Sequence, residues 1–149
     1  MYRWRRKKLS YNIFTAFVAY FQEEITNLDT LRTALTPVLQ EYYNHGKSAE
    51  VIRFLESTSI KPSLAPMVAY LAVVTALDKK AAEREMTSHL LADMYEALLN
   101  EQQFEAAISQ LLQDLPDLTL DCPGMLFTVM RMLRKRLVYF CWKIIIYFP

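Results

Sequence analysis

Glycine, histidine and cysteine are scarce in this 149-residue chain. The two glycines, Gly46 and Gly124, lie far apart, whereas phosphate-binding loops need clustered glycines, so the sequence excludes loops of the Walker and dinucleotide-binding kinds. The two histidines and two cysteines lack the spacing of metal ligands, and no nucleophile–base pair can be assembled. We therefore predict a protein that is not an enzyme and needs no cofactor or metal. Two cysteines do not make a disulfide framework, which favours a reducing intracellular setting. We expect the cytoplasm, with the nucleus as a second location.

Long apolar runs are absent as well. No uninterrupted apolar stretch reaches the roughly 18–20 residues that a membrane-spanning helix needs. Basic residues 1–8 and the apolar run 13–21 resemble the start of a secretory signal, but no small-residue cleavage site follows them. The length suits about one domain, and we expect that domain to be soluble and monomeric.

The formal net charge of +1 conceals an uneven distribution. Residues 1–8 and 131–143 hold five basic side chains each, whereas residues 9–130 hold seven basic and all sixteen acidic side chains, a net charge of −9. Such a field favours a basic protein partner over nucleic acid on the central surface. The basic N-terminus, with Tyr2 and Trp4 among its cations, suggests a weak RNA contact, although a solvated terminus is the simpler interpretation.

Helix-favouring residues dominate the chain. Leu, Ala, Met, Glu and Gln are abundant, and apolar residues recur at helical spacing from about residue 35. The pattern predicts helices that begin near Thr36, Ser48, Pro62 and Pro66, Ala81, and Asn100. Short connections imply antiparallel neighbours, so the predicted fold is all-α, with helical hairpins stacked as a short HEAT-like α-solenoid.

Local signals place several helix ends. Thr36 is a suitable N-cap for a helix with Pro37 in its first turn, and Gly46 is a suitable C-terminal stop. Asn100 and Gln103 have the spacing of a capping box. Each signal predicts a helix end from hydrogen bonds within a few residues, without reference to the rest of the fold.

Residues 114–123 combine three carboxylates and several leucines between two prolines. Because proline lacks a backbone donor and disfavours helix in the residue before it, this segment predicts an ordered break between two helices. A sixth helix would then begin at Pro123. Leucines would anchor the break while Asp117 and Asp121 remain available to bind basic side chains.

Four strings in the chain resemble one family. The strings are LTPVLQEYYNHG (35–46), EVIRFLE (50–56), REMTSHLLADM (84–94) and LLQDLPDLTLDCP (111–123). They are similar to the MI domain, also written MA-three, and more to that of cell-death-associated translation repressors than to that of the initiation-factor 4G scaffolds. The resemblance implies a domain over residues 35–137, an N-terminal extension over 1–34 and a divergent apolar tail over 138–149, which leaves the solenoid incomplete at its C-terminal end.

The resemblance also implies a function. MI domains of these repressors bind and inhibit the DEAD-box helicase initiation factor 4A through acidic side chains. The matching positions here are Glu41, Asp78, Asp117 and Asp121, with Asp in place of the family's Glu at 78 and 117. The alternatives are a fragment of a 4G-like scaffold, or a truncated product that is non-functional or lies at a membrane surface.

Each acid also has a simpler structural explanation. Asp121 could cap the helix expected after it, Glu41 could be an ordinary exposed helix residue, and Asp78 could complement a neighbouring helix N-terminus. His45, next to Gly46, is suited to the negative end of a helix.

Overall fold

The computed structural model describes residues 23–121 and Arg131. Five α-helices and one short 3-10 helix make up this part of the chain: α2 (Leu28–His45), α3 (Ser48–Ser57), η1 (Pro62–Leu64), α4 (Ala65–Leu77), α5 (Ala81–Ala97) and α6 (Glu101–Asp121). The prediction of an all-α fold is confirmed. None of these helices is long and apolar enough to cross a bilayer.

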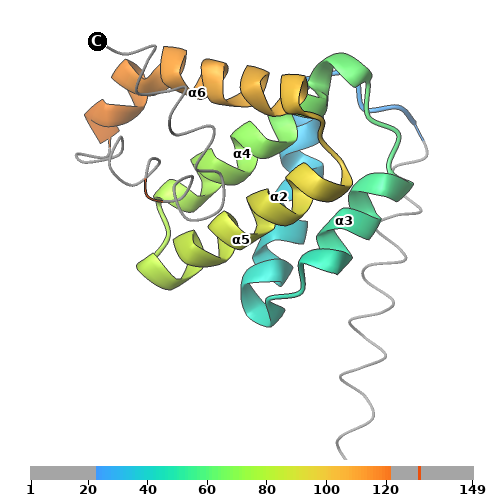
Figure 1. Cartoon of the computed structure of the whole chain (residues 1–149), viewed down its shortest axis with the longest axis horizontal. Helices are drawn as coiled ribbons and strands as arrows, with labels where there is room; N and C mark the ends of the chain where they lie inside the picture. Colours follow the sequence, from blue (N-terminus) through green and yellow to red (C-terminus); the bar gives the residue numbers. More distant parts are fainter. Residues whose placement is uncertain (1–22, 122–130, 132–149) are drawn as a thin grey trace, which may run out of the picture.

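The helices stack as hairpins. α2 pairs with α3, and the next hairpin, formed by α4 and α5, packs beside it (Figure 1). The first helices of successive hairpins pack on one another, α2 on α4 and α4 on α6. The second helices also pack together, α3 on α5. This is the arrangement of an α-solenoid, so the predicted architecture is confirmed.

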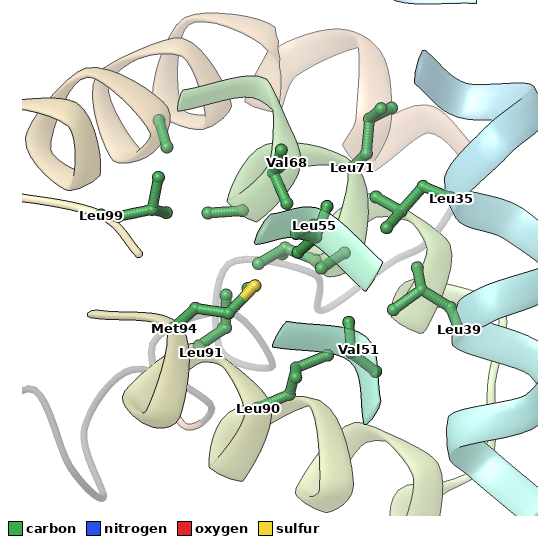
Figure 2. Close-up of a cluster of buried hydrophobic side chains, with 14 of the residues drawn as sticks. Leu35, Leu39, Val51, Leu55, Val68, Leu71, Leu90, Leu91, Met94 and Leu99 are labelled. Carbon is green, nitrogen blue, oxygen red and sulfur yellow. The ribbon is translucent and has the colours of Figure 1, made fainter. Parts of the chain in front are cut away.

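The hydrophobic core lies between the stacked hairpins, and α4 is at its centre. Figure 2 shows Leu35 and Leu39 of α2 facing side chains from α3, α4 and α5. α4 packs against α2, α5 and α6, and its buried side chains include Val68 and Leu71. Burial of each large aliphatic side chain stabilises the fold by about 1.5–3 kcal/mol, so this shared core holds the helix ends in fixed relative positions.

The helix ends predicted from local signals are largely confirmed. Gly46 ends α2 in the left-handed conformation with φ 69°, and its N–H donates to the carbonyl of Tyr42 at 2.7 Å. The capping box before α6 is complete, because the Asn100 N–H donates to Gln103 Oε1 at 3.1 Å and the Gln103 N–H to Asn100 Oδ1 at 2.9 Å. Pro66 lies in the first turn of α4, where its missing donor removes no helical hydrogen bond.

The predicted start of the first helix was wrong. α2 begins at Leu28, and Asn27 is its N-cap, whose Oδ1 accepts the Thr30 N–H at 2.8 Å. Thr36 is not a cap: its hydroxyl donates to the Arg32 carbonyl at 2.7 Å, and Pro37 lies inside the helix. Burial of apolar residues in the extra turns offsets the hydrogen bond that Pro37 removes. α3 begins at Ser48, as predicted, and its N-cap residue is Lys47.

The predicted break at residues 114–123 was also wrong. α6 continues without interruption from Glu101 to Asp121, and Pro116 lies inside it. Leu115 is buried and Leu118 packs against the core, so apolar contacts on both sides of the proline favour continuation of the helix. The sixth helix predicted to start at Pro123 lies outside the described residues.

The segment before α2 is attached to the α3–η1 connection. Ile25 and Ile60 form an isolated parallel bridge, in which the Ile25 N–H donates to the Ser59 carbonyl at 2.8 Å and the Lys61 N–H to the Ile25 carbonyl at 3.0 Å. The Ile25 side chain is only 1% exposed. Residues 23–27 therefore belong to the folded unit.

Candidate partner-binding surface

Three of the four predicted contact residues lie near the ends of two neighbouring helices. α4 and α6 pack together and run in the same direction, so their C-termini are on the same side of the molecule (Figure 1). Asp78 is the C-cap residue of α4 and is exposed, Asp117 is exposed in α6, and Asp121 is the last residue of α6 that the structure describes. We call these three residues the acidic edge. For Asp121 the structure describes the backbone position only.

A hydrogen bond fixes the register of the two helices. The Tyr70 hydroxyl of α4 donates to Oδ2 of Asp114 of α6 at 2.8 Å. Asp78 and Asp121 lie about two helical turns beyond these partners, on α4 and α6 respectively. The backbone therefore brings Asp78 and Asp121, far apart in sequence, to the same end of the helical stack.

Asp78 is at the negative end of the dipole of α4. The C-terminus of a helix has the negative end of the helix dipole, where an acidic side chain is destabilising by about 0.3–1 kcal/mol. Asp78 is the C-cap residue of α4, and Asp117 and Asp121 add two carboxylates on the neighbouring helix α6. A cationic partner would reduce the repulsion at this position, and the predicted role of Asp78 beside a helix N-terminus stays a prediction.

Asp114 has a different role from Asp117 and Asp121. In addition to Tyr70, it accepts hydrogen bonds from Gln110 Nε2, at 3.0 Å to Oδ1 and 3.1 Å to Oδ2. Both oxygens of the Asp114 carboxylate are thus used inside the domain, and the residue anchors α6 on α4. The Gln110–Asp114 spacing of one turn was visible in the sequence, but the contact with Tyr70 was not.

Glu41 lies with a separate set of residues. It is in the last turn of α2, and Oε1 of Glu41 is 2.7 Å from Nε2 of His45. The two side chains line a shallow depression together with residues before and within α3, which include Lys47 and Glu50. His45 is the last residue of α2, as its predicted place at the negative end of a helix requires.

Two tyrosines connect the end of α2 to α5. The Tyr42 hydroxyl donates to the Met86 carbonyl at 2.7 Å, and the Tyr43 and Thr87 hydroxyls are 2.9 Å apart. Burial, with Asp93 and Tyr43 as smaller causes, raises the pKa of Tyr42 to about 12. The helical spacing of apolar residues in the sequence predicts only a place in the core for these two tyrosines. Both fix the helix that holds Glu41.

Within residues 23–121 and Arg131, no group of three or more His, Cys, Asp or Glu side chains is arranged to hold a metal ion. The exposed carboxylates of Asp78 and Asp117 can instead accept hydrogen bonds from basic side chains. Arginine suits such a site because its planar guanidinium can donate two hydrogen bonds to one carboxylate.

Comparison with known proteins gives a consistent result. Residues 31–138 match the MA3 domain family. The chain is 42% identical over 89 residues to programmed cell death protein 4 from Gallus gallus and from Homo sapiens, which covers 60% of this chain and 19% of each relative. It is 28% identical over 100 residues to MA3 domain-containing translation regulatory factor 3 from Arabidopsis thaliana, which covers 67% of this chain and 14% of that protein.

The aligned segment is therefore about a fifth of the length of the programmed cell death proteins that it matches. The family match spans most of the chain and includes every described helix except the first turn of α2. The chain belongs to the MA3 domain family.

Proposed function

We propose that this chain is a translation-regulatory binding module that binds and inhibits the DEAD-box helicase initiation factor 4A. The observation that supports this proposal most directly is the acidic edge, where Asp78, Asp117 and Asp121 gather at the ends of α4 and α6. The names of its relatives, which include translation regulatory factors, support the regulatory role. The proposed activity is binding, without catalysis.

The proposed contact is electrostatic and pre-organised. The central part of the chain has a net charge of −9, which attracts a basic surface and speeds its association. The helices that hold the acids are fixed by the core and by the Tyr70–Asp114 hydrogen bond, so little conformational entropy is lost on binding. Loss of one partner of a buried charged pair at an interface typically costs about 2–5 kcal/mol.

Isothermal titration of the purified helicase with the full chain tests the proposal. Wild type should form a 1:1 complex that weakens as salt is raised, because exposed charges are screened. The double variant Asp117→Asn with Asp121→Asn keeps the size of both side chains and removes their charge. It should weaken binding by at least about tenfold, which corresponds to about 1.4 kcal/mol.

A charge-matched control is available on the same domain. Asp29 is exposed in the first turn of α2, and Glu56 is exposed near the end of α3. Asp29→Asn with Glu56→Gln changes the net charge by the same amount outside the proposed surface. Because salt screens distant exposed charges and the loss of Asp29 affects only the local helix dipole, this variant should bind the helicase within about twofold of wild type. Equal weakening by both double variants would refute the assignment of the surface, and no binding by wild type would refute the function.

A further inference from the structure

Glu41 and His45 form a close pair in the last turn of α2. Nε2 of His45 is 2.7 Å from Oε1 of Glu41, and the two side chains are 51% and 43% exposed. A neutral imidazole can donate one hydrogen bond from Nε2, and a protonated one donates as a cation. The contact therefore persists in both states, but the net charge of the pair changes from −1 to zero when His45 gains a proton.

Other charged groups near this pair come from α3 and α5. On the side of α3, Lys47 Nζ is 3.4 Å from Glu50 Oε1, so these two opposite charges offset each other in the same depression. On the side of α5, the charges of Asp93 and Glu83 act on Tyr42 and Tyr43, the neighbours of Glu41 in sequence. Because imidazole is the side chain that changes charge between about pH 5 and 8, His45 is the group here that can alter the local charge in that range.

We propose that His45 is a positioning residue for Glu41 and makes partner binding at this position dependent on pH. The inference rests on the proposed function, since it takes Glu41 as a contact for a basic partner. Above neutral pH, the His45 N–H holds the Glu41 carboxylate while the pair keeps its negative charge. Protonation of His45 neutralises the pair, and the attraction for a basic side chain falls.

α5 contains a second pair of the same kind. His89 Nε2 is 3.6 Å from Glu85 Oε1, again one helical turn apart, and the side chains are 49% and 37% exposed. Glu85 is not among the residues of the proposed contact. His89 therefore provides a matched control, with the same chemistry and a similar exposure at a different place on the surface.

The test compares the affinity of the helicase for three full-length chains, wild type, His45→Gln and His89→Gln, at about pH 6 and pH 8, where imidazole titrates. Glutamine can still donate a hydrogen bond to Glu41 but cannot gain a proton. Wild type and His89→Gln should lose affinity on acidification by about two- to fivefold more than His45→Gln, the range of one exposed charge pair. The contribution of the helicase's own titration cancels, because the same helicase is used throughout.

Nuclear magnetic resonance supplies a readout that does not need the helicase. The chemical shift of the Glu41 carboxyl carbon should differ between about pH 6 and pH 8 in wild type and stay unchanged in His45→Gln, because only the imidazole can gain a proton there. An equal response of this carbon in both chains, or equal pH dependence of binding in wild type and His45→Gln, would overturn the inference. If wild type bound no helicase at either pH, the proposed function would fail together with the inferred pH-dependent binding, while a Glu41 response that is lost in His45→Gln would still establish the pair.

Discussion

The hydroxyl of Tyr70 on α4 donates a 2.8 Å hydrogen bond to the carboxylate of Asp114 on α6, and this contact joins successive hairpins. Burial is the main cause that raises the pKa of Tyr70 to about 12, and the hydrogen bond and charge of Asp114 add to it. The hydrogen bond is therefore most favourable when the Tyr70 phenol is neutral and the Asp114 carboxylate is ionised. This hydrogen bond holds α4 and α6 in register, and the register of these helices sets the position of the acidic edge.

Tyr70→Phe should destabilise the domain by about 1–2 kcal/mol. Hydrogen bonds to charged groups contribute about 1.5–3 kcal/mol, and partial exposure of this pair lowers that value. Urea unfolding followed by circular dichroism measures the change in the free energy of unfolding. Tyr43→Phe is the comparison, because it removes a hydroxyl contact between neutral groups and should cost only about 0.5–1.5 kcal/mol. A Tyr70→Phe variant as stable as wild type would show that the bond adds nothing in solution.

The domain should lose stability in strongly alkaline solution. The pKa of Tyr42 and of Tyr70 is about 12 in the folded protein, above the ordinary value of 10.0. A group whose pKa rises on folding stabilises the fold fully below its unfolded pKa, so this contribution is present up to about pH 10 and is lost as pH rises through about 12. Unfolding free energy measured across this range should fall steadily.

Spectrophotometric titration of tyrosinate identifies the groups responsible. The wild-type curve should have a late phase near pH 12, and Tyr42→Phe and Tyr70→Phe should each reduce its amplitude. The late phase should vanish in denaturant, where every tyrosine titrates at its ordinary value. A single phase near pH 10 in the folded protein would contradict the pKa values of both residues.

Residues 23–27 should contribute measurably to stability. Ile25 is 1% exposed and is held by two backbone hydrogen bonds to the α3–η1 connection. Ile25→Ala should therefore cost about 2–5 kcal/mol, the usual range for removal of a buried isoleucine side chain. Thermal unfolding of the full chain measures the change.

The neighbouring residue provides the control for Ile25. Thr26 is exposed, so Thr26→Ala should change stability by less than about 0.5 kcal/mol. A fragment that starts at Leu28 lacks both the buried Ile25 and the Asn27 cap, and it should unfold at a lower temperature than one that starts at Glu23. Equal stability of these two fragments would show that the segment does not belong to the cooperative unit.

The sequence was sufficient where structure depends on neighbouring residues. Gly46 ends α2 and the Asn100–Gln103 capping box starts α6, as predicted, because both motifs are completed within a few residues. Helical periodicity and short connections were also sufficient for the hairpin arrangement. The start of α2 and the continuation of α6 were not predictable in this way, because tertiary burial of residues such as Leu31 and Leu115 decided them against the local preference of a proline.

The candidate site was predictable only in part. The sequence and its family resemblance identify the acids, and the placement of Asp78 near the end of α6 required the packing of α4 on α6. The roles of Tyr70 and His45 came from side-chain contacts. The Tyr70–Asp114 pair joins two separate helices, and no periodic pattern in one sequence specifies such a contact.

Replacement of Pro116 should stabilise the domain. A proline inside a helix costs about 3 kcal/mol relative to alanine, because it removes a hydrogen bond and clashes with the carbonyl one turn earlier, here that of Leu112. Proline also restricts the unfolded chain, which returns about 0.4–1 kcal/mol. Pro116→Ala should therefore raise the free energy of unfolding by about 1–3 kcal/mol in urea.

Pro66→Ala is the matched control for this prediction. Pro66 lies in the first turn of α4, where the N–H that alanine introduces would have no acceptor within the helix. We expect no gain in stability from that variant. A loss of stability in Pro116→Ala would mean that the local distortion at the proline is needed to seat Leu115 in the core. In that case helicase affinity should fall as well, since Asp117 and Asp121 follow directly on the same helix and would change direction with it.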